Sequence, residues 1–512
     1  MVDFEERVNR RHLARRLMVV GTYAVMLAAS ARGSSGPARS GPDAASAGRS
    51  GSGGMSVAAG GKGAAGPPGT GGGAGGTGGG GGERGSTGGG AGALGSAGNG
   101  GSGSGGSGGG GGVGGAGGCV LYGTATSLYI DGQGPGALIS EAQARRRLQL
   151  LSPFTAWLRF YSSLSGYSEA ACIAKKEMGK KIALGASIGP DADPNEREIQ
   201  ALIAAANQGC VDIAVVGSET LLRADQTPAA IIALIRRVKD AVPPTVQVAT
   251  AEVYNRLTAE VIAAEDVVLA HIYPFWENVP ARYAVAVLHA RYQEMKVRAG
   301  SKQVVVAETG WPSSGRGDAT PEIAATHLVQ VASWSRAVGV PTFAFSGFDE
   351  MWKTNEGTVG PFWGYLDAAG QLKPGMERAL IRCDTSPDVW SGTQLIGGAG
   401  TPAILFTNVP PRGATAVLEG RVEHVRPAEQ QVAVYILVGG VWWSKPTTQA
   451  PSTRIWPDGT FQVTVVTGGD DAQATELRAY LLPVGTLPPL AAGASAELPP
   501  SLTGYPVAQA SR

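Results

Sequence analysis

Two glutamates, Glu219 and Glu308, each end a short apolar run in this chain of 512 residues. Such a run is typical of a strand that is buried on both faces. Because a buried charge is costly, a carboxylate at the end of the run indicates either an ion-pair partner or a functional role. A pair of these carboxyl groups could perform acid–base and nucleophilic chemistry if one is protonated and the other is ionised. For either residue alone, a glutamate held by a structural ion pair is the alternative.

The glutamates belong to a repeated pattern of β-rich apolar runs and amphipathic helical stretches. Eight strands are predicted, at Val120–Ser127, Ala156–Tyr161, Lys181–Ser187, Asp212–Gly217, Val246–Ala251, Asp266–Ile272, Gln303–Ala307 and Thr342–Ser346. Helical periodicity is clearest at Glu141–Leu151, Glu196–Asn207, Pro228–Ala241, Ala281–Ala299 and Pro321–Val338. Residues 119–383 therefore predict a (β/α)₈ TIM barrel, a fold of about 250 residues. A doubly wound open sheet is disfavoured, because no G-x-G-x-x-G follows the first strand and polar residues gather at most strand ends.

In the second predicted strand, Trp157, Arg159 and Tyr161 share one face by alternation, so Arg159 is expected to point into the barrel mouth. A buried guanidinium requires a carboxylate partner, and Glu308 is the best candidate. A structural ion pair and a catalytic role are compatible for this pair.

The string from Glu308 to Gly315, E-T-G-W-P-S-S-G, resembles the signature of family 17 glycoside hydrolases, the β-1,3-glucanases and related glucanosyltransferases. The resemblance covers residues 119–383 and implies that Glu308 is the nucleophile and Glu219 the general acid/base. The family usually has an asparagine before the acid/base, whose amide binds the sugar 2-hydroxyl. Ser218 stands there in this chain, and its shorter hydroxyl predicts a water-mediated contact and a changed rate or substrate preference.

A retaining mechanism requires the two carboxyl groups to lie roughly 5–5.5 Å apart in different surroundings. Arg159 is expected to favour the charged form of Glu308. Glu219 has no cation close in sequence and is expected to hold its proton at higher pH.

The resemblance also implies a sugar-binding groove at the strand ends. It places Tyr273 beside the nucleophile and Trp276 in the groove, and the F-D-E-x-W-K string implies that Glu350 and Lys353 bind sugar hydroxyls. A solvated pair is the alternative for these last two residues, and a core position is the alternative for any single tryptophan, although three follow successive strands at 276, 311 and 352. The predicted substrate-binding residues are Tyr129, Arg159, Ser218, Tyr254, Tyr273, Trp276, Trp311, Glu350 and Lys353.

The N-terminal part of the chain reads as an export signal followed by a spacer. Arginines precede an apolar core from Leu17 to Ala29, so residues 1–31 predict a signal peptide, with an uncleaved membrane anchor as the alternative. Residues 32–118 are almost entirely Gly, Ser, Ala and Thr and predict a disordered tether. A secreted, cell-surface or periplasmic protein is expected.

The charge and cysteine content restrict the partners. With 42 basic and 41 acidic residues, bulk charge does not suggest nucleic acid. Cys119 and Cys383 bracket the predicted barrel and are a plausible disulfide, which leaves Cys172 and Cys210 as the other pair; free buried thiols are the alternative. The histidine and cysteine spacings fit no zinc motif, so neither a metal nor a cofactor is expected.

After a linker at 384–402, alternating residues and tight turns predict a small β-sandwich over 403–485, and the Pro- and Ala-rich tail 486–512 is expected to be disordered. Trp442, Trp443 and Trp456 fit its core slightly better than a glycan-binding face. The sequence therefore predicts an exported, monomeric enzyme that hydrolyses β-1,3-glucan internally. The alternatives are a β-1,3-glucanosyltransferase with the same intermediate and a non-catalytic glycan-binding surface protein.

Overall fold

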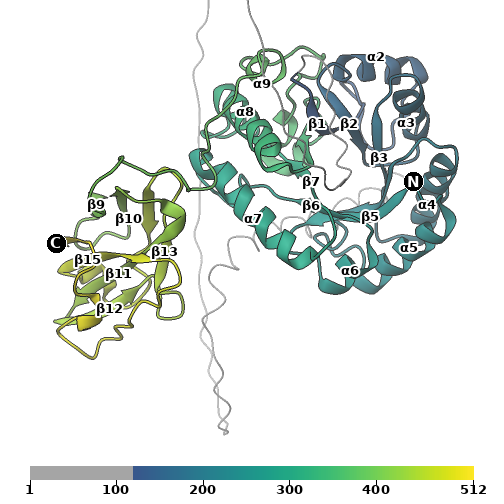
Figure 1. Ribbon diagram of the computed structural model, residues 1–512. Helices are drawn as coiled ribbons and strands as arrows, with labels where there is room; N and C mark the ends of the chain where they lie inside the picture. Colours follow the sequence, from purple (N-terminus) through teal and green to yellow (C-terminus); the bar gives the residue numbers. More distant parts are fainter. Residues whose placement is uncertain (1–118) are drawn as a thin grey trace, which may run out of the picture. The chain divides into compact units, whose positions relative to one another are not determined.

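The computed structural model describes residues 119–512, so the predicted signal segment 1–31 and tether 32–118 lie outside the described residues. The first part of the described chain is a closed barrel in which β1 to β8 follow one another in order and every neighbouring pair is parallel, including β8 with β1 (Figure 1). Its strands are β1 (Leu121–Ala125), β2 (Thr155–Phe160), β3 (Lys181–Ala186), β4 (Ile213–Ser218), β5 (Gln247–Val253), β6 (Val268–His271), β7 (Val304–Thr309) and β8 (Thr342–Phe345). The prediction of a TIM barrel is confirmed, and the closed order excludes an open sheet.

The barrel strands are buried on both faces, as their apolar sequences require. Val215, Ala249, Leu269 and Val305 fill the interior, whereas alternate strand residues such as Ala214 pack under the surrounding helices. All eight predicted strands agree with the structure to within two residues at each end. Deviations of two residues shorten β1 and β6 and extend β5 and β7, so Glu308 lies inside its strand rather than after it.

Helices surround the barrel (Figure 1). They are α2 (Glu141–Leu151), α3 (Tyr167–Lys176), α4 (Ala192–Asn207), α5 (Pro228–Ala241), α6 (Ala259–Ala264), α7 (Ala284–Ala299), α8 (Pro321–Val338) and the short α9 (Glu377–Leu380), with 3₁₀ turns η1 (Ala281–Tyr283) and η2 (Thr354–Phe362). The N-termini of α5 and α8 are each set by a threonine followed by proline. The Thr227 hydroxyl accepts from the Ala230 amide at 3.2 Å and the Thr320 hydroxyl from the Ile323 amide at 3.3 Å.

Two disulfides hold the barrel, as predicted. Cys119 is bonded to Cys383 with 5.0 Å between their Cα atoms, and Cys172 to Cys210 with 4.6 Å. All four cysteines of the chain are therefore paired, and the alternative of free thiols is wrong. The chain beyond Cys383 first stays on the barrel, because Trp390 is buried in the cluster that also holds Trp334 of α8.

The C-terminal part consists of antiparallel sheets. One sheet has the order β14-β10-β9, and the other has the order β12-β11-β15-β16, with β13 paired to β11. Their strands are β9 (Ala403–Asn408), β10 (Leu418–Glu423), β11 (Gln430–Val438), β12 (Val441–Lys445), β13 (Ser452–Arg454), β14 (Thr460–Val463), β15 (Glu476–Pro483) and β16 (Val507–Ser511), with 3₁₀ turns η3 (Pro427–Glu429), η4 (Asp471–Gln473) and η5 (Pro500–Leu502). Both sheets contribute to one apolar cluster, which includes Val422 and Phe461 from the first and Val434 and Leu477 from the second. This arrangement agrees with the predicted sandwich.

The expectation of a disordered tail at 486–512 is wrong. Val507–Ser511 forms β16, which pairs along β15 from Glu476 to Tyr480. The Pro- and Ala-rich composition of the tail gave little sign of a strand, but β15 offers an edge with unpaired backbone groups, and β16 satisfies them. Of the three tryptophans assigned to the core, Trp442 is buried, whereas Trp456 is half-buried and Trp443 lies on the surface.

Within residues 119–512, every helix falls short of the length or hydropathy that crossing a bilayer requires.

Candidate active site

The side chains that could do chemistry gather where β2, β4, β6 and β7 end at the mouth of the barrel. The end of β4 is bent to present Glu219: Gly217 has a φ of 80° and Glu219 a φ of 56°, both in the left-handed region. For a residue with a side chain this conformation costs on the order of 1–3 kcal/mol, so the surroundings must impose it. The Glu219 amide donates to the Ala251 carbonyl of β5 at 2.8 Å, which fixes the bend.

Glu308 is held in an almost fully buried, cation-rich environment. Its carboxylate forms an ion pair with Arg159 of β2, as the alternation in that strand predicted, and their side chains are 7% and 1% exposed. The Tyr273 hydroxyl donates to Glu308 Oε2 at 2.6 Å. Burial alone would raise the pKa of Glu308, but His271, Arg159 and the Tyr273 hydrogen bond together bring it well below its usual range. Glu308 is therefore an ionised carboxylate.

Glu219 has a more open position, with 29% of its side chain exposed. His271, the last residue of β6, lies between the two carboxylates: its Nδ1 is 2.9 Å from Glu219 Oε1 and its Nε2 is 3.3 Å from Glu308 Oε1. One oxygen of each glutamate and one nitrogen of His271 all lie within 4.8 Å of one another. The acids at the ends of β4 and β7 thus converge on one point.

Arg159, which forms the ion pair with Glu308, also contacts Ser218. Arg159 Nη2 donates to Ser218 Oγ at 3.1 Å, and the Ser218 carbonyl accepts from Arg223 at 2.8 Å. The hydroxyl is therefore held on the same side of the mouth as both glutamates.

The aromatic residues divide between a wall of the mouth and the core beneath it. Trp276 is 37% exposed and packs against Phe275 and Trp363, with ring centroids 5.1 and 5.6 Å apart. Trp311 is buried, because its ring packs against Phe275 and its indole nitrogen donates to the Asp318 carbonyl at 2.7 Å. The expectation that Trp311 lines the groove is wrong: its ring is held inward by Phe275 and by the Asp318 carbonyl.

The loop after β8 carries a buried ion pair. Lys353 Nζ lies 2.7 Å from Glu350 Oε2, and both side chains are less than a tenth exposed. Burial lowers the pKa of Lys353, but the carboxylates of Glu350 and Glu356 outweigh it and raise the pKa above its ordinary value. The alternative of a solvated pair is therefore wrong, and Lys353 Nζ also lies 4.3 Å from the centre of the Phe345 ring.

The two remaining predicted residues lie in different surroundings. Tyr129 packs edge-on against Trp352 of the β8 loop, with ring centroids 6.1 Å apart. Tyr254 packs against the cluster between the barrel and its outer helices, under the guanidinium of Arg291 at 5.2 Å. The structure therefore brings Tyr129 to the loops of the mouth but associates Tyr254 with the outer layer.

His271, Tyr161 and Trp363 were not predicted as site residues. His271 ends an apolar run just as Glu219 and Glu308 do, so the same signal was available. The ring centre of Tyr161 lies 4.9 Å from Cζ of the Arg159 guanidinium. Tyr161 is two residues after Arg159, so alternation had placed both side chains on the same face. Trp363 had no signal, because it follows a long irregular loop whose path depends on tertiary contacts.

Glu219, His271 and Glu308 are also the group in residues 119–512 whose ligand atoms lie close enough together to hold a metal ion. The Arg159 guanidinium already occupies the position of a cation beside Glu308. Because a second positive charge there would be repelled, the site suits a neutral, polar ligand better than a metal.

The family model of the BtgE/BtgC glycoside hydrolase domain matches residues 123–364 of this chain. The protein named "Probable glucan endo-1,3-beta-glucosidase btgC" from Aspergillus fumigatus is 28% identical over 274 residues, which are 46% of this chain. The match spans only 40% of that relative's length. A glucan 1,3-β-glucosidase from Schizosaccharomyces pombe is 28% identical over 251 residues, covering 44% of this chain and 77% of that protein.

Among solved structures, a glycoside hydrolase family 17 β-1,3-glucanosyltransferase from Rhizomucor miehei is 28% identical, with a TM-score of 0.46. The similarity covers 51% of this chain and 98% of that protein. The family match and the sequence relatives fall on the same barrel that carries the two glutamates. Over residues 123–364 the barrel is therefore similar to the BtgE/BtgC glycoside hydrolase domain, in agreement with the glycoside hydrolase that the sequence predicted.

Proposed function

We propose that the barrel hydrolyses β-1,3-glucan within the chain and with retention of configuration, with Glu308 as nucleophile and Glu219 as general acid/base. The names of the Aspergillus and Schizosaccharomyces relatives support β-1,3-glucan as the substrate class. The observation that carries the mechanism is the convergence of one oxygen from each glutamate within 4.8 Å. This closeness fits a retaining pair, whose carboxyl groups lie about 5–5.5 Å apart, better than an inverting pair, whose carboxyl groups are more widely spaced to admit a water.

In the first step, a Glu308 oxygen attacks the anomeric carbon while Glu219 gives its proton to the departing glycosidic oxygen. The Arg159 ion pair and the Tyr273 hydrogen bond keep Glu308 ionised and aim its lone pairs. Glu219 is suited to proton transfer because it is the more exposed of the two carboxyls and reaches the mouth.

In the second step, Glu219 takes a proton from an incoming water, whose oxygen attacks the anomeric carbon and releases Glu308. His271 contacts both carboxylates and is suited to hold them in position through both steps. Another sugar hydroxyl in place of water would give a glucanosyltransferase with the same intermediate.

The groove residues have distinct proposed roles. Trp276 offers an exposed ring face to a pyranose, and Ser218 stands where a hydroxyl beside the scissile bond would be bound. The Glu350–Lys353 pair is proposed to shape the adjacent subsite. Tyr129 and Trp352 extend the mouth beyond it.

The disulfides support a protein that folds in an oxidising compartment, which agrees with a secreted or cell-surface location. We propose that the chain comprises a signal at 1–31, a tether at 32–118, the barrel at 119–383, a joint at 384–402 and a β domain that continues through β16.

Substitution of Glu308 by Gln is expected to lower the rate of laminarin hydrolysis on the order of 10⁴-fold or more, because a carboxamide cannot form the intermediate. Glu322→Gln on α8, a residue whose side chain is 78% exposed, is the control and should leave the rate unchanged. Rescue of Glu308→Gly by azide should yield the α-glycosyl azide, whereas rescue of Glu219→Ala should yield the β product.

Product analysis separates the remaining functions. Laminari-oligosaccharides should give only shorter products, and products longer than the substrate would establish transfer instead. Equal and negligible release of reducing sugar by wild type and Glu308→Gln would indicate a non-catalytic glycan-binding protein.

A further inference from the structure

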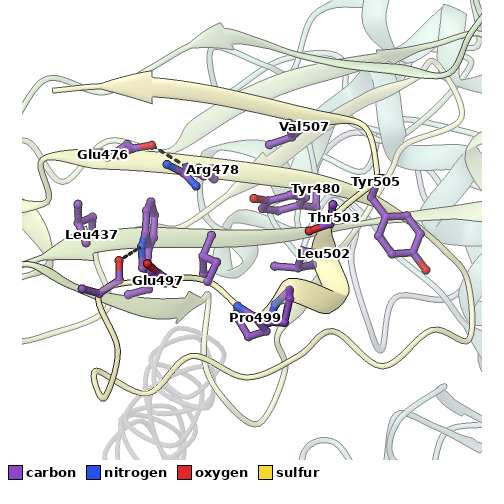
Figure 2. Close-up of a pocket in the computed structure, with 15 residues that line it drawn as sticks. Leu437, Glu476, Arg478, Tyr480, Glu497, Pro499, Leu502, Thr503, Tyr505 and Val507 are labelled. Atoms are coloured by element: carbon purple, nitrogen blue, oxygen red, sulfur yellow. Dashed lines mark hydrogen bonds and ion pairs between the residues drawn. The ribbon is translucent and has the colours of Figure 1, made fainter.

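A pocket of about 460 Å³ lies on the C-terminal sandwich (Figure 2). It is on the face of the β12-β11-β15-β16 sheet that points away from the other sheet. Alternation along β15 explains this face: Leu477 and Ala479 enter the sandwich core, so Glu476, Arg478 and Tyr480 project outward. The outward face of the sheet forms one wall of the pocket, and the segment between β15 and β16 forms the second wall. The lining residues are Leu437, Trp442, Glu476, Arg478, Tyr480, Val507 and residues 496–500 and 502–505.

The floor of the pocket is a stacked ion pair. Arg478 Nε donates to Glu476 Oε1 at 2.7 Å, and its guanidinium carbon lies 4.8 Å from the centre of the Trp442 ring. The side chains of Arg478 and Glu476 are 32% and 24% exposed, and both line the pocket. Figure 2 shows this pair beside the Tyr480 ring, with Tyr505 at one end of the pocket.

The segment between β15 and β16 is held in place by hydrogen bonds to Trp442 of β12. The Trp442 amide donates to the Ser495 carbonyl at 3.0 Å, and Trp442 Nε1 donates to the Ala496 carbonyl at 3.1 Å. Gly493 has a φ of 77° and lies so close to Trp443 that a Cβ atom would come within 2.1 Å of the indole. Pro499 and the turn η5 stiffen the rest, so the pocket is formed in advance of any ligand.

The chemistry of the lining selects the kind of ligand. The charges of Arg478 and Glu476 are already paired, so the floor does not concentrate one sign of charge as a site for a phosphate or a metal would. It does present guanidinium donors and carboxylate acceptors side by side, which a pair of adjacent hydroxyls can satisfy together. The half-buried ring of Tyr505 can stack on an apolar C–H face of such a ligand. The volume of the pocket lies within the range of small-molecule binding sites.

We propose that this pocket binds a segment of neutral polysaccharide and so attaches the enzyme to an insoluble glycan independently of the barrel. The proposal that the pocket binds a neutral glycan does not depend on whether the barrel is catalytically active. The choice of β-1,3-glucan as the first probe rests on the proposed function of the barrel, and cellulose and chitin are therefore tested beside it.

The test is co-sedimentation of the full chain with insoluble curdlan, cellulose or chitin, in a Glu308→Gln background that prevents cleavage. Tyr505→Ala is expected to weaken binding about five- to tenfold through loss of the stacking face. Arg478→Ala is expected to weaken it about tenfold, and Tyr505→Phe to bind like the parent. The matched control is Arg421→Ala on β10, whose Arg421–Glu423 pair has the same spacing and lies on the other sheet, and it should bind like the parent.

The proposal is overturned if the parent binds none of the three glycans, or if Tyr505→Ala, with unchanged thermal unfolding, sediments as the parent does. Preferential loss of binding to any one glycan supports it. Cleavage of soluble laminarin by the chain with Glu308 intact is measured separately. A chain that binds through the pocket but cleaves nothing therefore contradicts only the function proposed for the barrel.

Discussion

The barrel mouth and the sandwich pocket both contain an arginine–glutamate pair beside aromatic rings, but they differ in burial. Arg159 and Glu308 are 1% and 7% exposed, whereas Arg478 and Glu476 are 32% and 24% exposed. Water screens the second pair and reorients around it, so its groups can exchange partners with a ligand at little cost. The first pair is cut off from water, and its electrostatic influence on Glu308 is fixed before a substrate arrives. Burial therefore separates a pair suited to catalysis from a pair suited to recognition.

The two pairs are expected to differ most in how much stability is lost when their arginine is replaced by alanine. Arg159→Ala should lower the free energy of unfolding by about 3–5 kcal/mol, because it leaves a buried carboxylate without its cation, and should abolish measurable hydrolysis. Arg478→Ala should cost under about 1 kcal/mol. Calorimetric unfolding of both variants checks this, and equal losses would show that burial does not distinguish the pairs.

A buried carboxylate of the barrel without a direct ion pair provides the second comparison. Glu265 accepts from the Thr250 amide at 2.9 Å, and burial raises its pKa to about 8. The folded state therefore holds a proton that the unfolded state releases above about pH 4.5, so wild-type stability falls as the pH rises toward 8. Glu265→Gln should match wild type near pH 4.5 and exceed it by about 2–4 kcal/mol above pH 8.

Thermal unfolding of wild type and Glu265→Gln at several pH values tests this expectation, with the exposed Glu322→Gln as the control. A difference that stays constant with pH would contradict a protonated Glu265.

The smallest expected effect concerns two tyrosine hydroxyls that each donate a hydrogen bond. Tyr273 donates to the Glu308 carboxylate at 2.6 Å, and Tyr435 donates to the Pro489 carbonyl at 2.7 Å. Because hydrogen bonds to charged groups are the stronger kind, Tyr273→Phe should lower kcat about 10–100-fold. Tyr435→Phe should leave kcat unchanged and cost about 1 kcal/mol of stability. Steady-state kinetics on laminarin would contradict this if both variants retained full kcat.

The sequence predicted the barrel well because each strand is buried on both faces and is therefore a continuous apolar run with turn residues at its ends. The same rule located Glu219 and Glu308, and alternation along β2 predicted that Arg159 would reach Glu308. The pairing of Cys119 with Cys383 followed from the need of a closed sheet to bring its ends together.

What the sequence concealed depends on contacts between distant segments. Trp311 follows a strand just as Trp276 does, but contacts with Phe275 and the Asp318 carbonyl, which are distant from the strand pattern, decide that its ring is buried. The helix α6 has six residues, too few for a periodicity of 3.6 to be recognised. Strand β16 became visible only with its partner β15, since five residues of mixed polarity indicate little by themselves.

The covalent link between Cys119 and Cys383 makes residues 119–383 a ring of backbone whose entry and exit lie 5.0 Å apart. A protease that cuts once within any loop of this ring would open it without releasing a fragment, since both halves would still be tied through sulfur. Nicked molecules would run as one species on a denaturing gel until a reductant is added, and Glu219 and Glu308 would stay in one covalently linked molecule.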